Sequence, residues 1–177
     1  MAHDDFTIQF ETTKGAFIAV AHPDWAPTGV QRLRELVESG FFENIAFFRV
    51  LEGFVAQFGI HGDPEVAAKW RDNQIKDDEV KASNKKGTIT FAMAGPDTRT
   101  SQLFVNLVDN RRLDSMGFAP VAEITEGMEV VESLYAGYGE GAPRGAGPDQ
   151  GTIQSRGNAY LKEQYPELDY ITSARIA

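Results

Sequence analysis

The 177-residue chain contains no cysteine. It therefore cannot form a disulfide, offer a thiolate nucleophile or bind zinc or an iron–sulfur cluster through cysteine. Positive charge is also scarce, with 17 Lys and Arg against 26 Asp and Glu, which gives a formal net charge of −9. Because proteins bind nucleic-acid phosphates mainly through clustered Lys and Arg, we do not expect a nucleic-acid partner.

Long apolar runs are missing as well. No stretch approaches the roughly 18 apolar residues of a membrane span, so we expect no membrane partner. The opening residues 1–5, Met-Ala-His-Asp-Asp, are acidic and lack the basic start and apolar run of a secretory signal. We therefore expect a cytoplasmic protein, although a mature chain trimmed of its signal would give the same pattern.

Bulky core material is abundant: 42% of the residues are hydrophobic, and there are 12 Phe, 5 Tyr and 2 Trp. This composition and length predict one globular domain over residues 1–177, expected to be a monomer. The expected core covers about residues 6–136. A segment dense in glycine and proline begins at Gly137, so residues 137–177 are expected to form a loop-rich C-terminal extension.

Short strands dominate the pattern. Phe6–Glu11 alternates apolar and polar residues, and a turn then leads into Ala16–Ala21, which predicts a hairpin. Further strands are expected at Ala46–Leu51, Phe54–Phe58, Gly87–Met93, Gln102–Leu107 and Phe118–Thr125.

Two helices are expected among these strands. Thr28 and Gln31 form a plausible capping box for a helix that ends near Gly40, and 127–135 has apolar residues at helical spacing. Many short strands with only two helices favour an all-β barrel or sandwich.

Several segments offer no convincing chemistry. Residues 61–86 are polar and lack a period, which predicts a long surface loop in which Asp77-Asp78-Glu79 is solvated. The glycine-rich residues 137–151 lack the Gly-Lys-Ser/Thr of a phosphate loop, and 158–164 is expected to form a short helix. Three ligands at useful spacing are absent around His3, His22 and His61, so we expect no metal and no cofactor.

One arginine stands inside an otherwise apolar hairpin, Phe47–Gln57. If Val50 pairs with Phe54 across the turn, alternation puts Arg49 and Gln57 on the same face of the sheet. The alternative is an edge-strand arginine whose guanidinium simply reaches solvent. Gln102 and Phe104 also share a face, because they lie two apart on a strand.

This hairpin resembles the signature of the cyclophilins, which are peptidyl-prolyl cis-trans isomerases. The matching pattern is Phe-x-Arg-Val-x-x-Gly-Phe-x-x-Gln at 47–57. Three further matches follow in the family's order: 91–98 with 101–105, Leu113-Asp114, and 127–131. The resemblance covers about residues 6–140, and the tail is similar to the extension of a bacterial branch of the family.

The resemblance implies a closed eight-stranded antiparallel barrel capped by two helices. It also implies isomerisation of X–Pro bonds in proline-containing segments of client proteins, assisting their folding, without a cofactor. Arg49 and Gln57 would be the catalytic pair. The substrate groove would be lined by Phe54, Ala92, Met93, Gln102, Phe104, Leu113 and Phe118.

This chain departs from the family pattern at several groove positions. Phe48 and Phe118 stand where the family often has His, Phe58 where Gly is frequent, and Met93 where Asn is common. Arg112 replaces the Trp of cyclosporin-sensitive members, so weak cyclosporin binding is expected. Two alternatives stay open: a non-catalytic chaperone or scaffold module of the same fold that binds proline peptides, and an unrelated β-barrel that binds a small ligand.

Overall fold

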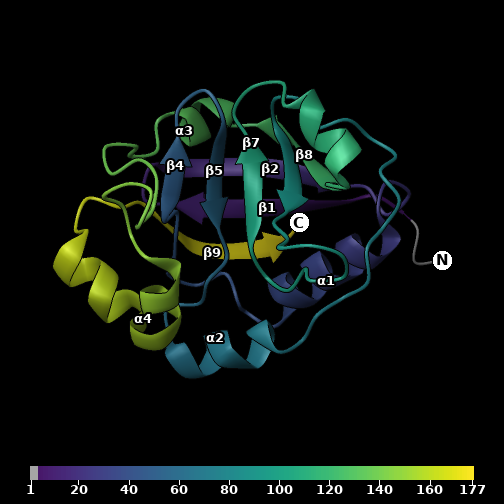
Figure 1. Cartoon of the computed structure of the whole chain (residues 1–177). Helices are drawn as coiled ribbons and strands as arrows, with labels where there is room; N and C mark the ends of the chain where they lie inside the picture. Colours follow the sequence, from purple (N-terminus) through teal and green to yellow (C-terminus); the bar gives the residue numbers. More distant parts are fainter. Residues whose placement is uncertain (1–3) are drawn as a thin grey trace.

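A single curled antiparallel sheet organises the chain. The computed structural model describes residues 4–177, so His3 lies outside the described residues. Nine strands follow the order β3-β9-β1-β2-β8-β6-β7-β5-β4 (Figure 1). The strands are β1 Phe6–Thr12, β2 Gly15–Ala21, β3 Ile45–Ala46, β4 Arg49–Leu51, β5 Val55–Phe58, β6 Thr88–Phe91, β7 Leu103–Asn106, β8 Pro120–Glu126 and β9 Tyr170–Ile176. The helices are α1 Pro27–Glu38, α2 Pro64–Arg71, α3 Met128–Glu132, α4 Gln150–Gln164 and the 3-10 helix η1 Arg111–Met116.

The first hairpin forms as the alternation predicts. β1 and β2 pair in register from Phe6 opposite Ala21 to Thr12 opposite Gly15. Phe10 lies opposite Phe17, and their rings stack with centroids 4.7 Å apart. The alternate side chains in the middle of this hairpin are buried and belong to the inner core: Ile8, Phe10, Phe17, Ala19 and Ala21.

The expected closed eight-stranded barrel is wrong in strand count and in closure. The predicted strand at Ala46–Leu51 is divided, because its first part pairs with β9 and its second part with β5. Phe47 and Phe48 separate the two parts, and both are buried, on different apolar clusters. The terminal strands β3 and β4 do not pair with each other, so the sheet is curled and its two ends are connected only by the chain.

The C-terminal segment is more regular than the loop-rich extension expected from the sequence. α4 begins with Asp149, whose carboxylate accepts from the Thr152 amide, and it is broken at Gly157, where φ is +63°. Because the break shifts the helical period, the sequence pattern predicts only the part of α4 after Gly157, residues 158–164. β9 then inserts between β1 and β3 in the sheet, and only Ile171 among its side chains is fully buried, which leaves little strand pattern to detect.

The polar excursion at 61–86 contains a helix that periodicity did not indicate. The Asp63 carboxylate accepts from the Glu65 amide, and Pro64 occupies the first turn of α2. Only Ala67 of this helix is fully buried, while Val66 and Trp70 are partly buried against the inner core, so its apolar face is short and gives a weak helical pattern. The expected helices near 28–40, 127–135 and 158–164 correspond to α1, α3 and the second half of α4, so α2 is the α-helix that the sequence analysis missed.

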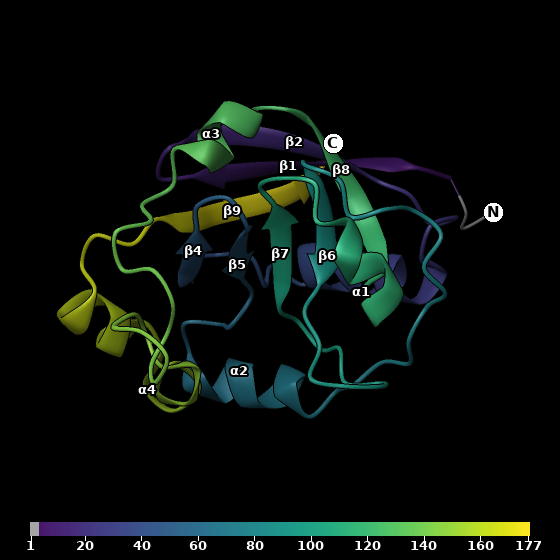
Figure 2. The same cartoon turned by 45° about the horizontal axis from the view of Figure 1, so that its top comes forward.

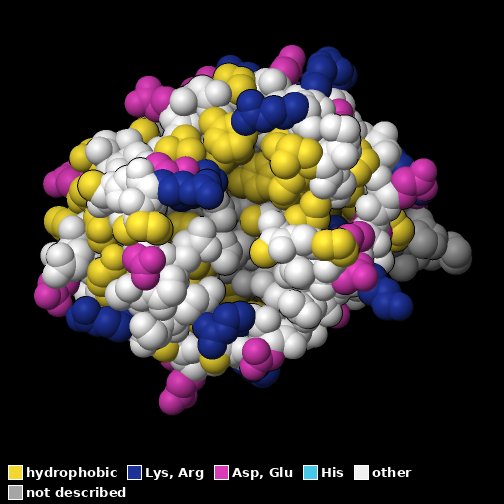
Figure 3. Space-filling view, in the orientation of Figure 1, with side chains coloured by type: hydrophobic (Ala, Val, Ile, Leu, Met, Phe, Trp, Pro, Cys, Tyr) yellow, Lys and Arg dark blue, Asp and Glu magenta, His cyan; other side chains and the backbone are white. Residues whose placement is uncertain are grey.

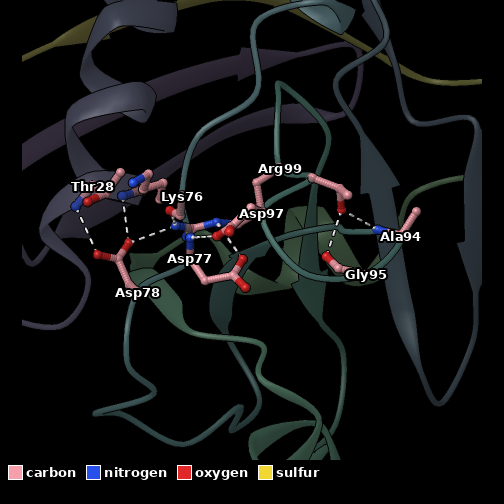
Figure 4. Close-up of polar contacts among 10 residues, drawn as sticks. Thr28, Lys76, Asp77, Asp78, Ala94, Gly95, Asp97 and Arg99 are labelled. Atoms are coloured by element: carbon pink, nitrogen blue, oxygen red, sulfur yellow. Dashed lines mark hydrogen bonds and ion pairs between the residues drawn. The ribbon is translucent and has the colours of Figure 1, made fainter.

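The start of α1 also differs from the sequence prediction, because Thr28 does not cap it. The N-cap residue is Ala26, and the amides of Thr28 and Gly29 donate to the Asp78 carboxylate at 3.0 and 2.7 Å. The same carboxylate accepts from Arg99 Nη2 at 3.0 Å (Figure 4). Asp78 is therefore not solvated as expected: its side chain is only 5% exposed.

The helices leave one face of β4, β5 and β7 open. α2 and α4 lie together at one end of the sheet and α3 at the other end (Figures 1 and 2). The inner core fills the concave side of the sheet beneath α1, and a smaller cluster lies against α4. Among residues 4–177, no helix has the length and apolar character needed to cross a membrane.

Candidate active site

Three residues lie side by side across three neighbouring strands on the open face. Arg49 on β4 is opposite Gln57 on β5, which is opposite Phe104 on β7. The expected pairing of Val50 with Phe54 is wrong by two residues, because the turn at 52–54 has three residues and Leu51 pairs with Val55. A shift of two preserves the side-chain alternation, so Arg49 and Gln57 do share a face.

A row of polar side chains extends from this point. Arg49 Nη1 donates to Gln57 Oε1 at 2.9 Å, and Gln57 Nε2 donates to Gln102 Oε1 at 2.9 Å. Gln102 Nε2 lies 3.4 Å from the Oε1 of Gln150, the first residue of α4. The side chain of Arg49 is 23% exposed, so its guanidinium borders solvent and is accessible to a ligand.

A carboxylate from the C-terminal segment accepts from the edge of the Arg49 guanidinium that Gln57 does not contact. Nε and Nη2 of Arg49 donate to the two carboxylate oxygens of Glu140 at 2.7 and 2.8 Å. The hydrogen bonds from Arg49 hold the pKa of Glu140 below its usual value, with further help from the Gly141 amide and Arg144 and against the effect of burial. Glu140 is therefore ionised at neutral pH.

An apolar pocket lies beside the polar row. Phe104 and Leu113 are each only 6% exposed, and they form a cluster with Val55 that is separate from the inner core. Phe118 meets Phe104 edge to face with ring centroids 5.8 Å apart. In the space-filling view, hydrophobic side chains gather in a hollow over β5 and β7 (Figure 3). Also packed against this cluster are Phe54 and Ala92.

Phe54 connects the pocket to two arginines. Its ring lies 5.9 Å from the guanidinium carbon of Arg49 and 5.1 Å from that of Arg112. Both arginines thus lie over an aromatic ring, a favourable arrangement for a cation. Arg112 is exposed on η1, at the rim of the pocket.

A second hollow opens beside the polar row. It has a volume of about 260 Å³ and is lined by Ala92 and Met93 together with Gln57, Gln102 and Gln150. The Ala92 amide donates to the Gln102 carbonyl at 2.9 Å, which holds the two sides of this hollow together. Gln57 and Gln102 therefore line this hollow, and Gln102 Nε2 can donate to a chain that lies in it.

Buried amides behind the pocket fix its walls. Asn84 is fully buried, and its Nδ2 donates to the carbonyl of Phe118 and to Asp114. Asn110 Nδ2 donates to the carbonyl of Phe54 at 3.0 Å. Burial opposes ionisation of Asp114, yet hydrogen bonds from Ser83 and Asn84 lower its pKa, so it remains a charged acceptor.

The structure brings all the predicted site residues to this one face. Catalytic and groove candidates from four separate stretches of sequence form the polar row and the two hollows. Sequence analysis missed Glu140 and Gln150, because a single acid in a glycine-rich segment and the first residue of a broken helix carry no spacing signal. His61 stands elsewhere: it packs against Phe41 and accepts from the Asp63 amide, and burial lowers its pKa.

The amino-acid sequence matches a known protein family and individual members of it. Residues 7–153 match the family model described as cyclophilin type peptidyl-prolyl cis-trans isomerase/CLD. Peptidyl-prolyl cis-trans isomerase B of Escherichia coli K12 is 30% identical over 136 residues, which cover 72% of this chain and 82% of that protein. Peptidyl-prolyl cis-trans isomerase A of Dickeya dadantii is 32% identical over 130 residues, covering 70% of this chain and 68% of that protein.

Solved structures share the fold at lower identity. A cyclophilin-type peptidyl-prolyl cis-trans isomerase of Cryptosporidium parvum superposes with a TM-score of 0.71 at 17% identity, covering 98% of each chain. A structure of that protein obtained in the presence of the dipeptide Ala-Pro gives a TM-score of 0.69 at 17% identity, covering 97% of this chain and 98% of that one. Cyclophilin AquaCyp293 of Hirschia baltica gives 0.66 at 18% identity, covering 95% of this chain and 72% of that one.

Proposed function

The chain belongs to the cyclophilin-type peptidyl-prolyl cis-trans isomerases, and we propose that it turns X–Pro bonds in client polypeptides with Arg49 as the catalytic group. Rotation about a peptide bond is opposed by a barrier of roughly 18 to 20 kcal/mol, because the amide nitrogen shares its lone pair with the carbonyl. In the twisted transition state this sharing is lost. The proline nitrogen then becomes pyramidal and accepts a hydrogen bond that the planar ground state cannot accept.

Arg49 is suited to donate that hydrogen bond. A guanidinium has five N–H groups and stays protonated at physiological pH. Three are engaged by Glu140 and Gln57, which leaves one on each Nη for a substrate. A donor that meets the nitrogen only in the twisted state stabilises the transition state more than the ground state, and this difference accelerates the rotation.

The neighbouring groups would hold the peptide. The proline ring is expected to lie in the apolar pocket of Phe54, Phe104, Leu113 and Phe118. Gln57 keeps the guanidinium oriented, and Gln102 can donate to a peptide carbonyl. Residues that precede the proline would extend toward Ala92 and Met93. No proton, electron or group is transferred, so this mechanism needs no cofactor.

One observation carries the proposal: a partly exposed arginine lies at the edge of an apolar pocket lined by aromatic and aliphatic side chains. Gln57 is opposite both Arg49 and Phe104, so the guanidinium and the apolar pocket lie two strand spacings apart. β4 and β7 are therefore about 10 Å apart, which lets one peptide contact both Arg49 and the pocket.

A protease-coupled assay tests the proposal. A chromogenic tetrapeptide with an X–Pro bond is cleaved only after cis molecules become trans, so an isomerase accelerates the slow phase. We expect acceleration by the wild type and strong loss with Arg49→Ala. Binding of the peptide without acceleration would instead identify the non-catalytic binding module, and the absence of both binding and acceleration would contradict the proposed function. The alternative of an unrelated β-barrel is wrong, because the family model matches residues 7–153.

Three further statements stay predictions from the sequence. Action on folding clients is tested by the refolding rate of a protein limited by prolyl isomerisation, and the single-domain monomer is tested by light scattering in solution. The cytoplasmic location is tested by cell fractionation.

A further inference from the structure

The polar row of the site is attached at both ends to the C-terminal segment. Glu140 binds Arg49 at one end, and Gln150 approaches Gln102 at the other. Residues 140–150 therefore border the site along its length. We propose that Glu140 is a positioning residue, which holds the guanidinium of Arg49 in the orientation needed for catalysis. This inference rests on the proposed function of Arg49.

The geometry of the pair selects one orientation of the guanidinium. Both carboxylate oxygens of Glu140 accept, one from Nε and one from Nη2, so the two planar groups meet edge to edge. A two-point contact fixes rotation about the last bonds of the arginine side chain, which a single hydrogen bond would leave free. The end of the guanidinium that carries Nη1 and Nη2 retains its remaining donors for a substrate.

The loop around Glu140 is built to keep the carboxylate in place. The Gly141 amide donates to Glu140 Oε1 at 2.9 Å, and the Glu140 carbonyl accepts from the Gly147 amide at 2.9 Å. A Cβ atom at Gly145 or Gly147 would lie 2.3 or 2.8 Å from that carbonyl oxygen, so the loop can fold back on Glu140 only with glycine there. Gly145 and Gly147 thus allow the loop to approach Glu140, and they do not form a phosphate loop.

The loop is also anchored from outside. The Tyr165 hydroxyl lies 3.0 Å from the Gly147 carbonyl, and the Tyr165 ring packs edge to face on Tyr138 at 4.9 Å and on Tyr160 at 5.7 Å. Asp149 closes the segment by capping α4. An anchored loop supplies an acceptor whose position is fixed before substrate binds, which is what orientation of a catalytic group requires.

The orientation set by Glu140 is transmitted along the row. With Arg49 as donor, Gln57 must present its Oε1 to Arg49 and its Nε2 to Gln102. Gln102 then accepts through Oε1 and directs its Nε2 away from Gln57, where it can donate to a substrate or to Gln150. Loss of Glu140 would therefore disturb both Arg49 and the amide orientation of the two glutamines.

The test compares purified full-length variants in the protease-coupled assay, with kcat and KM separated by NMR exchange on the same peptide. We expect Glu140→Ala to lower kcat about tenfold with KM changed less than about twofold, because misorientation weakens a contact made in the transition state. Glu140→Gln should have a kcat between those of wild type and Glu140→Ala, since its single amide oxygen can accept only one of the two hydrogen bonds from Arg49. The matched control is Glu132→Ala, which removes a surface ion pair with Lys86 outside the site.

Two variants separate this inference from the proposed function. If Glu140 acts through Arg49, Glu140→Ala should have no further effect in an Arg49→Ala background. Normal turnover by Arg49→Ala would overturn the function of Arg49 itself. Reduced turnover by Arg49→Ala with unchanged or increased turnover by Glu140→Ala would overturn only the positioning role, and an increase would identify Glu140 as a blocking contact.

Discussion

Arg49 and Gln57 face each other directly across the β4–β5 ladder, and one hydrogen bond of 2.9 Å joins their side chains. A strand pair holds opposite side chains about 5 Å apart at their Cβ atoms, so the contact is dictated by backbone pairing rather than by flexible side chains. The position of Arg49 beside the pocket is thereby set by the pairing of β4 with β5.

Removal of Arg49 is expected to reduce turnover while the fold persists. Arg49→Ala loses a charge-assisted hydrogen bond in the transition state, typically about 1.5 to 3 kcal/mol, which corresponds to roughly 10- to 150-fold in kcat/KM. The protease-coupled assay measures the rate, and circular dichroism measures the fold. Arg156→Ala serves as control, because Arg156 is a surface arginine on α4. Activity within twofold of wild type would remove Arg49 from the mechanism.

The pH dependence should be flat near neutrality and fall only in acid. Glu140 has a lowered pKa because of Arg49, the Gly141 amide and Arg144, so its ion pair is intact above the usual glutamate range. As pH falls through the lowered folded pKa, protonation releases Arg49. We expect constant kcat/KM from about pH 6 to 9, because guanidinium and amide groups do not titrate there.

The acid decline should belong to Glu140 and therefore disappear in Glu140→Ala. Both proteins are followed by circular dichroism at each pH, so that unfolding is not mistaken for lost turnover. A sigmoidal loss centred between pH 6 and 7 on folded protein would contradict this account and make His61 the next residue to mutate.

Cyclosporin is expected to inhibit the wild type weakly. Arg112 stands where the family's sensitive members have Trp, and its guanidinium already occupies the face of Phe54. Arg112→Trp should lower the concentration for half inhibition at least about tenfold, which corresponds to an apolar contact of about 1.4 kcal/mol. Arg111→Trp is the control on the neighbouring exposed position. Equal inhibition of wild type and Arg112→Trp would show that this position does not decide sensitivity.

Asp78 should matter for stability although it belongs to neither the polar row nor the two hollows. Its carboxylate pairs with Arg99, which is only 3% exposed, and Nε and Nη1 of Arg99 are buried without a hydrogen-bond partner among the described residues. Asp78→Ala would remove the carboxylate that hydrogen-bonds the buried guanidinium of Arg99 and would leave α1 uncapped, so we expect the free energy of unfolding to fall by about 3 to 5 kcal/mol.

Asp77 is the matched control for that experiment. It is the adjacent acid, 37% exposed and 4.0 Å from Arg99 Nε. Asp77→Ala should change the free energy of unfolding in urea by less than about 0.5 kcal/mol. Equal effects of the two substitutions would contradict the capping argument.

Local sequence signals succeeded where neighbours in the chain are neighbours in space. The alternation in β1 and β2 predicts their hairpin, and the spacing of Gln102 and Phe104 predicts their common face. The shared face of Arg49 and Gln57 survived an incorrect register, because side-chain alternation repeats every two residues.

Features made by distant segments could not be predicted. The cap of α1 comes from Asp78, whose two neighbours look equally solvated in the sequence. β9 has a single fully buried residue, Ile171, so its membership of the sheet depends on partners at the start of the chain. Glu140 reaches Arg49 across 91 residues, and nothing in the residues around it distinguishes it from any acid in a loop.

The insertion of β9 beside β1 has a consequence for the protein's own biosynthesis. Arg175 Nη2 donates to Gln9 Oε1 across 166 residues. At 5 to 20 residues per second, β1 emerges from the ribosome on the order of ten seconds or more before its second partner exists. During that interval β1 has β2 on one side and an unpaired edge on the other, the kind of edge that recruits other chains. A nascent chain of this protein is thus itself a client for protection until its last strand arrives.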